Sequence, residues 1–173
     1  LGTLGGLSVL AVGGGSIRVV TDTRALPANV RMLTVDTGDV PAVVRITTDV
    51  DAKEPRVDVR MVTSTNATQL TVVNNDIGSQ VTLRDIGSRL MRRHNAGELK
   101  VILPPGVARE LSVAVNQRSG TLSIDTDLDQ LVANTDGPVT LGGSARRVYV
   151  SVRHGDITTR TPLAVIVTFT AAT

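Results

Sequence analysis

The sequence has no cysteine and no tryptophan, and it has one tyrosine and one phenylalanine among 173 residues. Without cysteine there are no disulfides, no thiolate catalysis and no cysteine-ligated metals. The absence of cysteine is compatible with an oxidising or a reducing compartment. The scarcity of aromatic rings argues against recognition of single-stranded nucleic acid or sugar rings by stacking, because such recognition uses aromatic faces. Either ligand would have to be bound through other residues.

A strong charge of either sign is also missing. The chain has 18 basic and 16 acidic residues, interspersed, for a net charge of +2, so we expect no broad electrostatic partner and no nucleic acid. What the chain does have is 41% hydrophobic residues, carried almost wholly by Val, Leu, Ile and Ala. Together with many threonines, this composition favours half-buried pleated surfaces and predicts an all-β domain.

A unit of short strand, glycine turn and short strand repeats through the second half. The turn glycines Gly120, Gly137 and Gly155 are 17 and 18 residues apart. Two positions after each glycine is an apolar residue, which gives the column Leu122, Val139 and Ile157. Before the turns we expect a second column, with spacings of 18, 19 and 17, at Val113, Leu131, Val150 and Val167. A period of 17 to 19 residues predicts a mainly parallel β-solenoid, because each coil buries its column only against the next coil.

The first half carries less regular copies of the same unit. Gly38 forms the turn of an early copy, and alternating residues predict strands over 57–61, 70–72 and 81–83. Residues 85–95 interrupt the alternation and are expected to form a loop or a short helical turn. Residues 97–103 are expected to form a strand closed by a Pro-Pro-Gly turn, and nothing in residues 30–83 suggests a helix.

Three segments are expected along the chain. Residues 1–20 are apolar and glycine-rich and indicate a membrane anchor or signal remnant, with a flexible leader as the alternative. Residues 21–29 have no period and are expected to be a linker, and residues 30–173 are expected to be the solenoid. Only four residues follow Phe169, without a polar cap. We therefore expect the natural chain to continue beyond this point, or a partner to cover the end.

Three stretches carry a resemblance: Leu33-Thr-Val-Asp-Thr-Gly-Asp-Val40, Gly97-Glu-Leu-Lys-Val-Ile-Leu-Pro-Pro105 and Val148-Tyr-Val-Ser-Val-Arg-His-Gly-Asp-Ile157. From about Val30 onward, the chain resembles the bacterial "putative adhesin" β-solenoid domains of unknown function. Sixteen arginines against two lysines, with the apolar start, make it similar to the membrane-anchored actinobacterial members, mycobacterial ones above all. The resemblance implies a right-handed solenoid outside the cytoplasmic membrane and supplies no catalytic residues.

Catalytic and metal-binding patterns are weak. His154 stands beside Gly155 and Asp156, but Ser119 and Asp136 occupy the same position before their own turn glycines, so His154 is expected to be a turn residue. Several aspartates near turns suggest calcium, yet the Gly-Gly-x-Gly-x-Asp repeat is missing and aspartate favours turns on its own account. We predict no catalytic, cofactor or metal site, and no enzyme.

We expect a non-enzymatic extracytoplasmic interaction or scaffolding module tethered to the cell membrane. One class of candidate contact is the open coil end, at Val165, Val167 and Phe169. The other is a basic and apolar loop, at Arg89, Leu90, Met91, Arg92 and Arg93. The partner would be an integral membrane protein or complex, or an envelope component. Two alternatives stay open: an accessory subunit of a larger membrane complex, and a polysaccharide-active enzyme using Asp58, Asp125 and Asp127.

Overall fold

The structure is a computed structural model that describes residues 6–11, 18–63, 68–76, 78–85, 96–160 and 166–171. These residues form fifteen strands and one four-residue helix, α1 (Pro105–Ala108). The prediction of an all-β chain is confirmed. The helix was not predicted, although Pro105 signals it, because the fixed φ of proline suits the first position of a helix.

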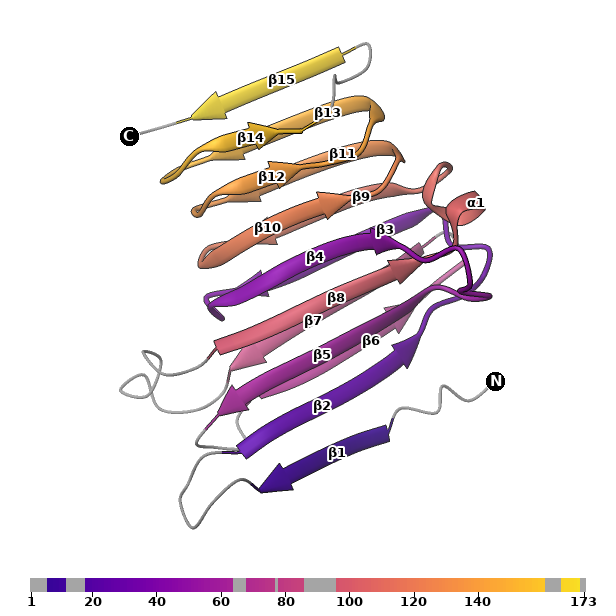
Figure 1. Ribbon diagram of the computed structural model, residues 1–173, viewed down its shortest axis with the longest axis vertical. Coiled ribbons are helices and arrows are strands. Elements are labelled where there is room, and N and C mark those ends of the chain that lie inside the picture. Colours follow the sequence, from indigo (N-terminus) through magenta and orange to yellow (C-terminus); the bar gives the residue numbers. More distant parts are fainter. Residues whose placement is uncertain are drawn as a thin grey trace.

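The strands form two sheets. Sheet A contains β1 (Gly6–Ala11), β2 (Arg18–Ala25), β5 (Arg56–Thr63), β8 (Ala96–Leu103), β4 (Ala42–Thr48), β10 (Gly120–Asp125), β12 (Val139–Leu141) and β14 (Ile157–Thr159), side by side in that order. Sheet B contains, in its order, β15 (Ile166–Ala171), β13 (Ala145–Val152), β11 (Leu128–Thr135), β9 (Ser112–Gln117), β3 (Met32–Gly38), β7 (Gly78–Asp85) and β6 (Thr68–Asn74). The strands stack along the long axis of the molecule, from β1 at one end to β15 at the other (Figure 1).

From β9 onward the chain alternates between the two sheets, and each strand pairs in parallel with the strand two places later. Leu122 is opposite Val139, and Val139 is opposite Ile157, so this predicted column is confirmed. Its members on β10 and β12 are buried, and so are the inward residues of β9, β11 and β13 in sheet B. The hydrophobic core therefore lies between the two sheets and runs along the stack.

The other predicted column is wrong in one place. Leu131 is opposite Val148, not Val150, and Val148 is opposite Val167. Val150 is instead opposite Ala133 and Phe169. Residues two apart on a strand share a face, so Val148 and Val150 are both inward and apolar, and the sequence pattern alone cannot choose between them.

The first half of the chain departs from uniform parallel stacking. The pairs β1–β2, β2–β5, β5–β8 and β6–β7 are antiparallel, whereas β3 and β4 pair in parallel with strands on both sides. Both sheets are thus mixed. The sequence could not show this, because side chains alternate with a period of two in parallel and antiparallel strands alike.

The predicted linker is also wrong over part of its length. Residues 21–25 belong to β2, which pairs with β5 along its whole length. Asp22 and Arg24 share the inward side of this strand and form an ion pair, with 3.2 Å between Asp22 Oδ2 and Arg24 Nη2. These inward charges hide the apolar alternation that would have indicated a strand.

Residues 6–11, within the predicted membrane segment, form β1 and pair with β2. Among the residues that the structure describes, no helix is both long and apolar enough to cross a membrane.

Close stacking of the coils explains the turn glycines. Gly120 has φ of +106°, a conformation that side chains disfavour, and Gly38 and Gly155 also have positive φ. Gly137 is required for a different reason: a Cβ built on it would lie 1.9 Å from the carbonyl oxygen of Gly120 in the neighbouring coil. The turns therefore pack backbone against backbone.

Candidate functional site

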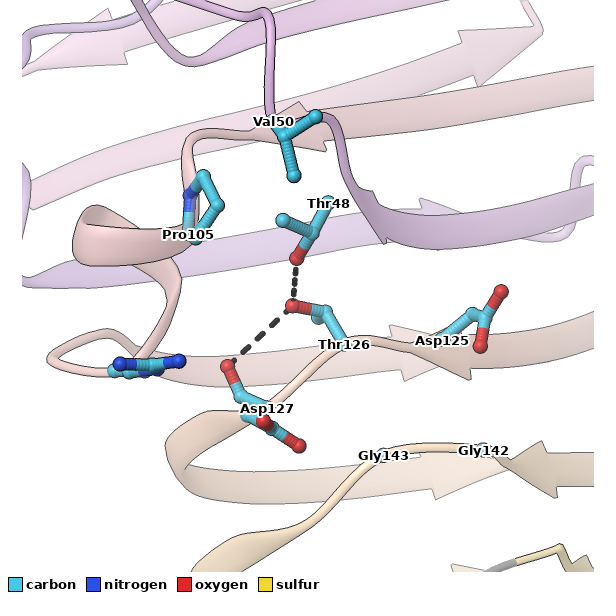
Figure 2. A pocket seen from close by; sticks show the side chains of 9 residues that line it. Thr48, Val50, Pro105, Asp125, Thr126, Asp127, Gly142 and Gly143 are labelled. Carbon is cyan, nitrogen blue, oxygen red and sulfur yellow. Dashed lines mark hydrogen bonds between the residues drawn. The ribbon is translucent and has the colours of Figure 1, made fainter.

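A groove of about 350 Å³ lies at the edge of the stack, and we call it the edge groove. It is found where β4, β10 and β12 end and beside α1 (Figure 2). Its lining residues are Thr48, Val50, Pro105, Arg109, Asp125, Thr126, Asp127, Gly142 and Gly143. Val50 is 81% exposed, and the groove offers a ligand one guanidinium, two carboxylates and a small apolar surface.

The residues at the centre of the edge groove are engaged in holding the coils together. Thr48 and Thr126 are joined by a hydrogen bond between their hydroxyls, which links two neighbouring coils (Figure 2). Asp127 Oδ1 accepts two hydrogen bonds from Ser144, one from the backbone N–H and one from the hydroxyl, each at 3.0 Å. The carboxylate of Asp127 therefore fixes the next turn, a structural role that aspartate takes in many turns.

The three aspartates predicted as alternatives for catalysis are not brought together. Asp125 and Asp127 line the edge groove, but Asp58 is on β5, and β8 and β4 separate β5 from β10 in sheet A. Asp58 is ion-paired with Arg56, with 3.3 Å between Oδ2 and Nε. A glycosidase needs two carboxylates on either side of one bond, and the three aspartates do not share one site.

His154 is exposed at its turn, and its backbone N–H donates to the carbonyl of Asp136. This is the place expected for a turn residue. Within the described ranges, no three histidine, aspartate or glutamate side chains gather closely enough to hold a metal ion.

The coil end at β14 is a second candidate surface. β14 is the last strand of sheet A and pairs only with β12 among the described residues. The carbonyl of Asp156 and the N–H of Arg160 bond to β12. Because hydrogen bonds along a strand point alternately to its two sides, the N–H groups of Ile157 and Thr159 point to the open side. The core column that is buried at Val139 is only half-buried at Ile157.

Not all of the predicted interaction residues can be placed. Residues 89–93, which carry the basic loop of Arg89, Leu90, Met91, Arg92 and Arg93, lie outside the described residues, and so does Val165. Val167 and Phe169 are on β15, opposite Val148 and Val150. In this register β15 is the last strand of sheet B.

A third surface was missed by sequence reasoning. It is a polar groove of about 220 Å³ on sheet B, which we call the amide groove. Its lining residues are Asn116, Gln117, Arg118, Asn134, Thr135, Asp136, Ser151 and Arg153. The available signal was a polar column beside the apolar one: Asn116, Asn134 and Ser151 recur at 18 and 17 residues. The spacing of apolar residues identifies the core positions of a repeat, but it does not identify the polar residues that face outward.

No protein-family model matches the chain, and no curated protein matches it. Solved structures with related geometry include a "putative cell adhesion protein" from Clostridium sporogenes, at 8% identity and a TM-score of 0.40, covering 88% of this chain and 99% of that one. A "putative adhesin" from Bacteroides fragilis has 13% identity and a TM-score of 0.42, covering 89% and 93%. At these values the likeness carries no conclusion about function.

Proposed function

We propose that this chain is a non-enzymatic interaction module that docks a partner at the coil end formed by β14 and β15. The observation that carries the proposal is the open edge of β14, where the N–H groups of Ile157 and Thr159 have no strand beside them among the described residues. A free strand edge is a template for a further strand, which binds through main-chain hydrogen bonds.

The strand at this edge is suited to pairing with a further strand. β14 reads Ile157-Thr158-Thr159 and carries no charge. Thr158 and Thr159 are exposed, and Ile157 is half-buried. Charged or proline residues that would oppose the pairing of an edge strand are therefore missing from β14.

Finer features of the proposal rest on the sequence. We propose that the parallel coils from β9 to β15 form a β-solenoid, that the domain lies on the extracytoplasmic side, and that the protein is tethered to the cell membrane. Membrane fractionation of the full-length protein tests the tether. If the chain is instead an accessory subunit of a larger membrane complex whose main contact lies away from the coil end, the Thr159→Pro variant described below should capture the partner as well as the wild type does.

The docking proposal is tested by Thr159→Pro. Proline removes one outward N–H and is tolerated on an edge strand, so the sheet is expected to keep its fold. Affinity capture from detergent-solubilised native membranes, with mass spectrometry, should recover a stoichiometric partner with the wild-type chain and at least about ten-fold less with the variant, as expected for lost edge hydrogen bonds.

The matched control is Thr159→Val, which changes the same side chain and keeps the N–H. It should capture the partner as well as the wild type. Circular dichroism and thermal unfolding of all three proteins check that the fold is unchanged. Equal capture by the proline variant, with its fold intact, would contradict docking at this edge.

A further inference from the structure

The outer face of sheet B carries most of the exposed large apolar side chains that the structure describes. There are four of these side chains: Met32, Val50, Val73 and Tyr149. Met32, Val73 and Tyr149 belong to β3, β6 and β13 of sheet B. A residue next to each of them on its strand is buried or half-buried, so these three point to the outer face. Exposed apolar residues that gather on one face indicate contact with another molecule.

An uncharged row of outward side chains crosses sheet B, and we call it the central row. Its members are opposite one another on six neighbouring strands: Val73 on β6, Gln80 on β7, Thr34 on β3, Ala114 on β9, Val132 on β11 and Tyr149 on β13. The exposed apolar side chains of Val73 and Tyr149 are at the two ends of this row. The small side chains of Thr34 and Ala114 are at its centre.

The outer face of sheet A is charged instead. Six charged side chains on β4, β5 and β8 alternate with buried residues and face outward: Arg45, Arg56, Asp58, Arg60, Glu98 and Lys100. In the two rows beside the central row of sheet B, the charged residues among those described are Asp36 and Arg147. The cores of protein–protein interfaces are depleted of charged residues and enriched in tyrosine and methionine. The outer face of sheet B therefore has the composition of an interface.

We propose that a second copy of this chain docks on the outer face of sheet B, about a two-fold axis that runs parallel to the strands between β3 and β9. The central row is self-complementary about this axis, because β6 of one copy lies against β13 of the other. Val73 then contacts Tyr149 of the second copy, and the small side chain of Thr34 faces that of Ala114, which allows close approach at the centre. Each pair occurs twice, as in any isologous interface.

The size of this face suits a stable dimer. Sheet B has seven strands of six to eight residues each. At about 4.8 Å between strands and about 3.3 Å per residue, the face measures roughly 34 by 20 Å. Two copies together bury about 1,400 Å², within the range of about 1,200–2,000 Å² for specific interfaces. No described helix or strand covers this face, because α1 lies at the side of the stack (Figure 1).

The twist of the sheet also favours a second copy as the partner. Two sheets that pack face to face keep their strands within about 30° of each other, and this angle arises from the twist of each sheet. A second copy supplies a sheet of the same length and the same twist. The two stacks then run in opposite directions, so both open coil ends stay free for the docking proposed above.

The oligomeric state of the full chain in solution tests the proposal. Sedimentation equilibrium at micromolar concentrations should show a dimer of the wild type. Tyr149→Asp and Val73→Asp should each weaken the dimer at least about ten-fold, because the interface would bury an unpaired carboxylate. Val50→Asp makes the same kind of change at an exposed residue outside sheet B, so this matched control should leave the dimer unchanged. Circular dichroism and thermal unfolding check the fold of each variant.

Cross-linking tests the position of the two-fold axis, and the absence of natural cysteine keeps the result specific. Val73→Cys and Tyr149→Cys chains are mixed and treated with a short bis-maleimide. The mixture should give a cross-linked dimer. Neither variant alone should give one, because equivalent positions of the two copies are about 24 Å apart across the strands.

A chain that stays monomeric overturns the proposal, and so does a dimer that both aspartate variants leave intact. Cross-linking of either cysteine variant with itself, but not with the other variant, also overturns it. The proposed docking edge at β14 is a separate contact at the end of the stack. Thr159→Pro should therefore dimerise normally, and Val73→Asp should still capture the membrane partner, so the two proposals can fail separately.

Discussion

Glycine at the turns sets how closely neighbouring coils can approach. At Gly137 the limit comes from the neighbouring coil, since a Cβ would lie 1.9 Å from the Gly120 carbonyl oxygen, which is backbone and cannot rotate away. At Gly106, in α1, a Cβ would meet nothing within 4 Å. The same substitution at these two glycines should therefore have opposite effects.

Gly137→Ala should lower the free energy of unfolding by about 2 to 4 kcal/mol, because the turn must move away from the next coil. Gly106→Ala should leave it unchanged or raise it by up to about 1 kcal/mol, because alanine restricts the unfolded chain and favours a helix. Urea denaturation followed by circular dichroism measures both changes. A Gly137→Ala protein as stable as wild type would mean that the coils do not stack at this distance.

Buried polar residues next to the turns have a related role. Gln117 is 1% exposed, and its Nε2 donates to the carbonyls of Ala42, at 2.7 Å, and Thr121, at 3.2 Å. Thr135 takes the equivalent position in the next coil, and its hydroxyl donates to the Gly137 carbonyl at 2.9 Å. These side chains satisfy carbonyls that the turns would otherwise leave without partners, as buried polar groups require.

At the scale of elements, strands in the middle of the stack differ from β14. β9 is paired with β3 on one side and β11 on the other, whereas β14 has three residues and pairs with β12 alone among the described residues. Backbone hydrogen bonds at a sheet edge open locally, at low free energy, whereas central ones open with global unfolding.

Hydrogen exchange should follow this difference in pairing. The amides of Ile157 and Thr159 should exchange at least about a hundred-fold faster than those of Val113 and Val115, since only the latter are bonded within a sheet on both sides. Exchange measured by NMR on the isolated chain checks this. Equal protection at Thr159 would show that its N–H is already bonded, and the edge would then be unavailable for a partner.

The strands are the part of the fold that the sequence predicts best. Alternation identifies them because it reports which side chains face the core, as at Leu122, Val139 and Ile157. It does not report strand direction, so the antiparallel strands of the first half were missed. It fails for β2, where Asp22 and Arg24 take inward positions. It also cannot distinguish Val148 from Val150, which share a face.

The candidate surfaces were predicted less well than the fold. The edge groove is lined by Thr48, Pro105 and Asp125, which are far apart in the sequence. They meet only because β4 and β10 end, and α1 begins, at the same edge of the stack. The amide groove has a period that can be read once the coil register is known. Its residues are polar and face outward. Polar residues are common at the outward positions of any strand, so a single strand gives no sign of the groove.

At the scale of the whole molecule, the stack is asymmetric. The hydrophobic core runs between the two sheets. Near one end, the Asp22–Arg24 ion pair lies on the inward side of β2. Near the other end, the apolar column of sheet A ends at Ile157, which is only half-buried. The open end at β14 is the part of this asymmetric stack to which we assign a macromolecular partner.

Site-specific photo-crosslinking in intact cell envelopes tests docking at the open coil end most directly. A photoreactive residue is placed at Thr159, on the open edge, or at Thr23, an exposed position on β2, in otherwise identical full-length chains. We expect a discrete adduct from position 159 and none from position 23. No adduct from position 159, or equal adducts from both positions, would contradict docking at this end.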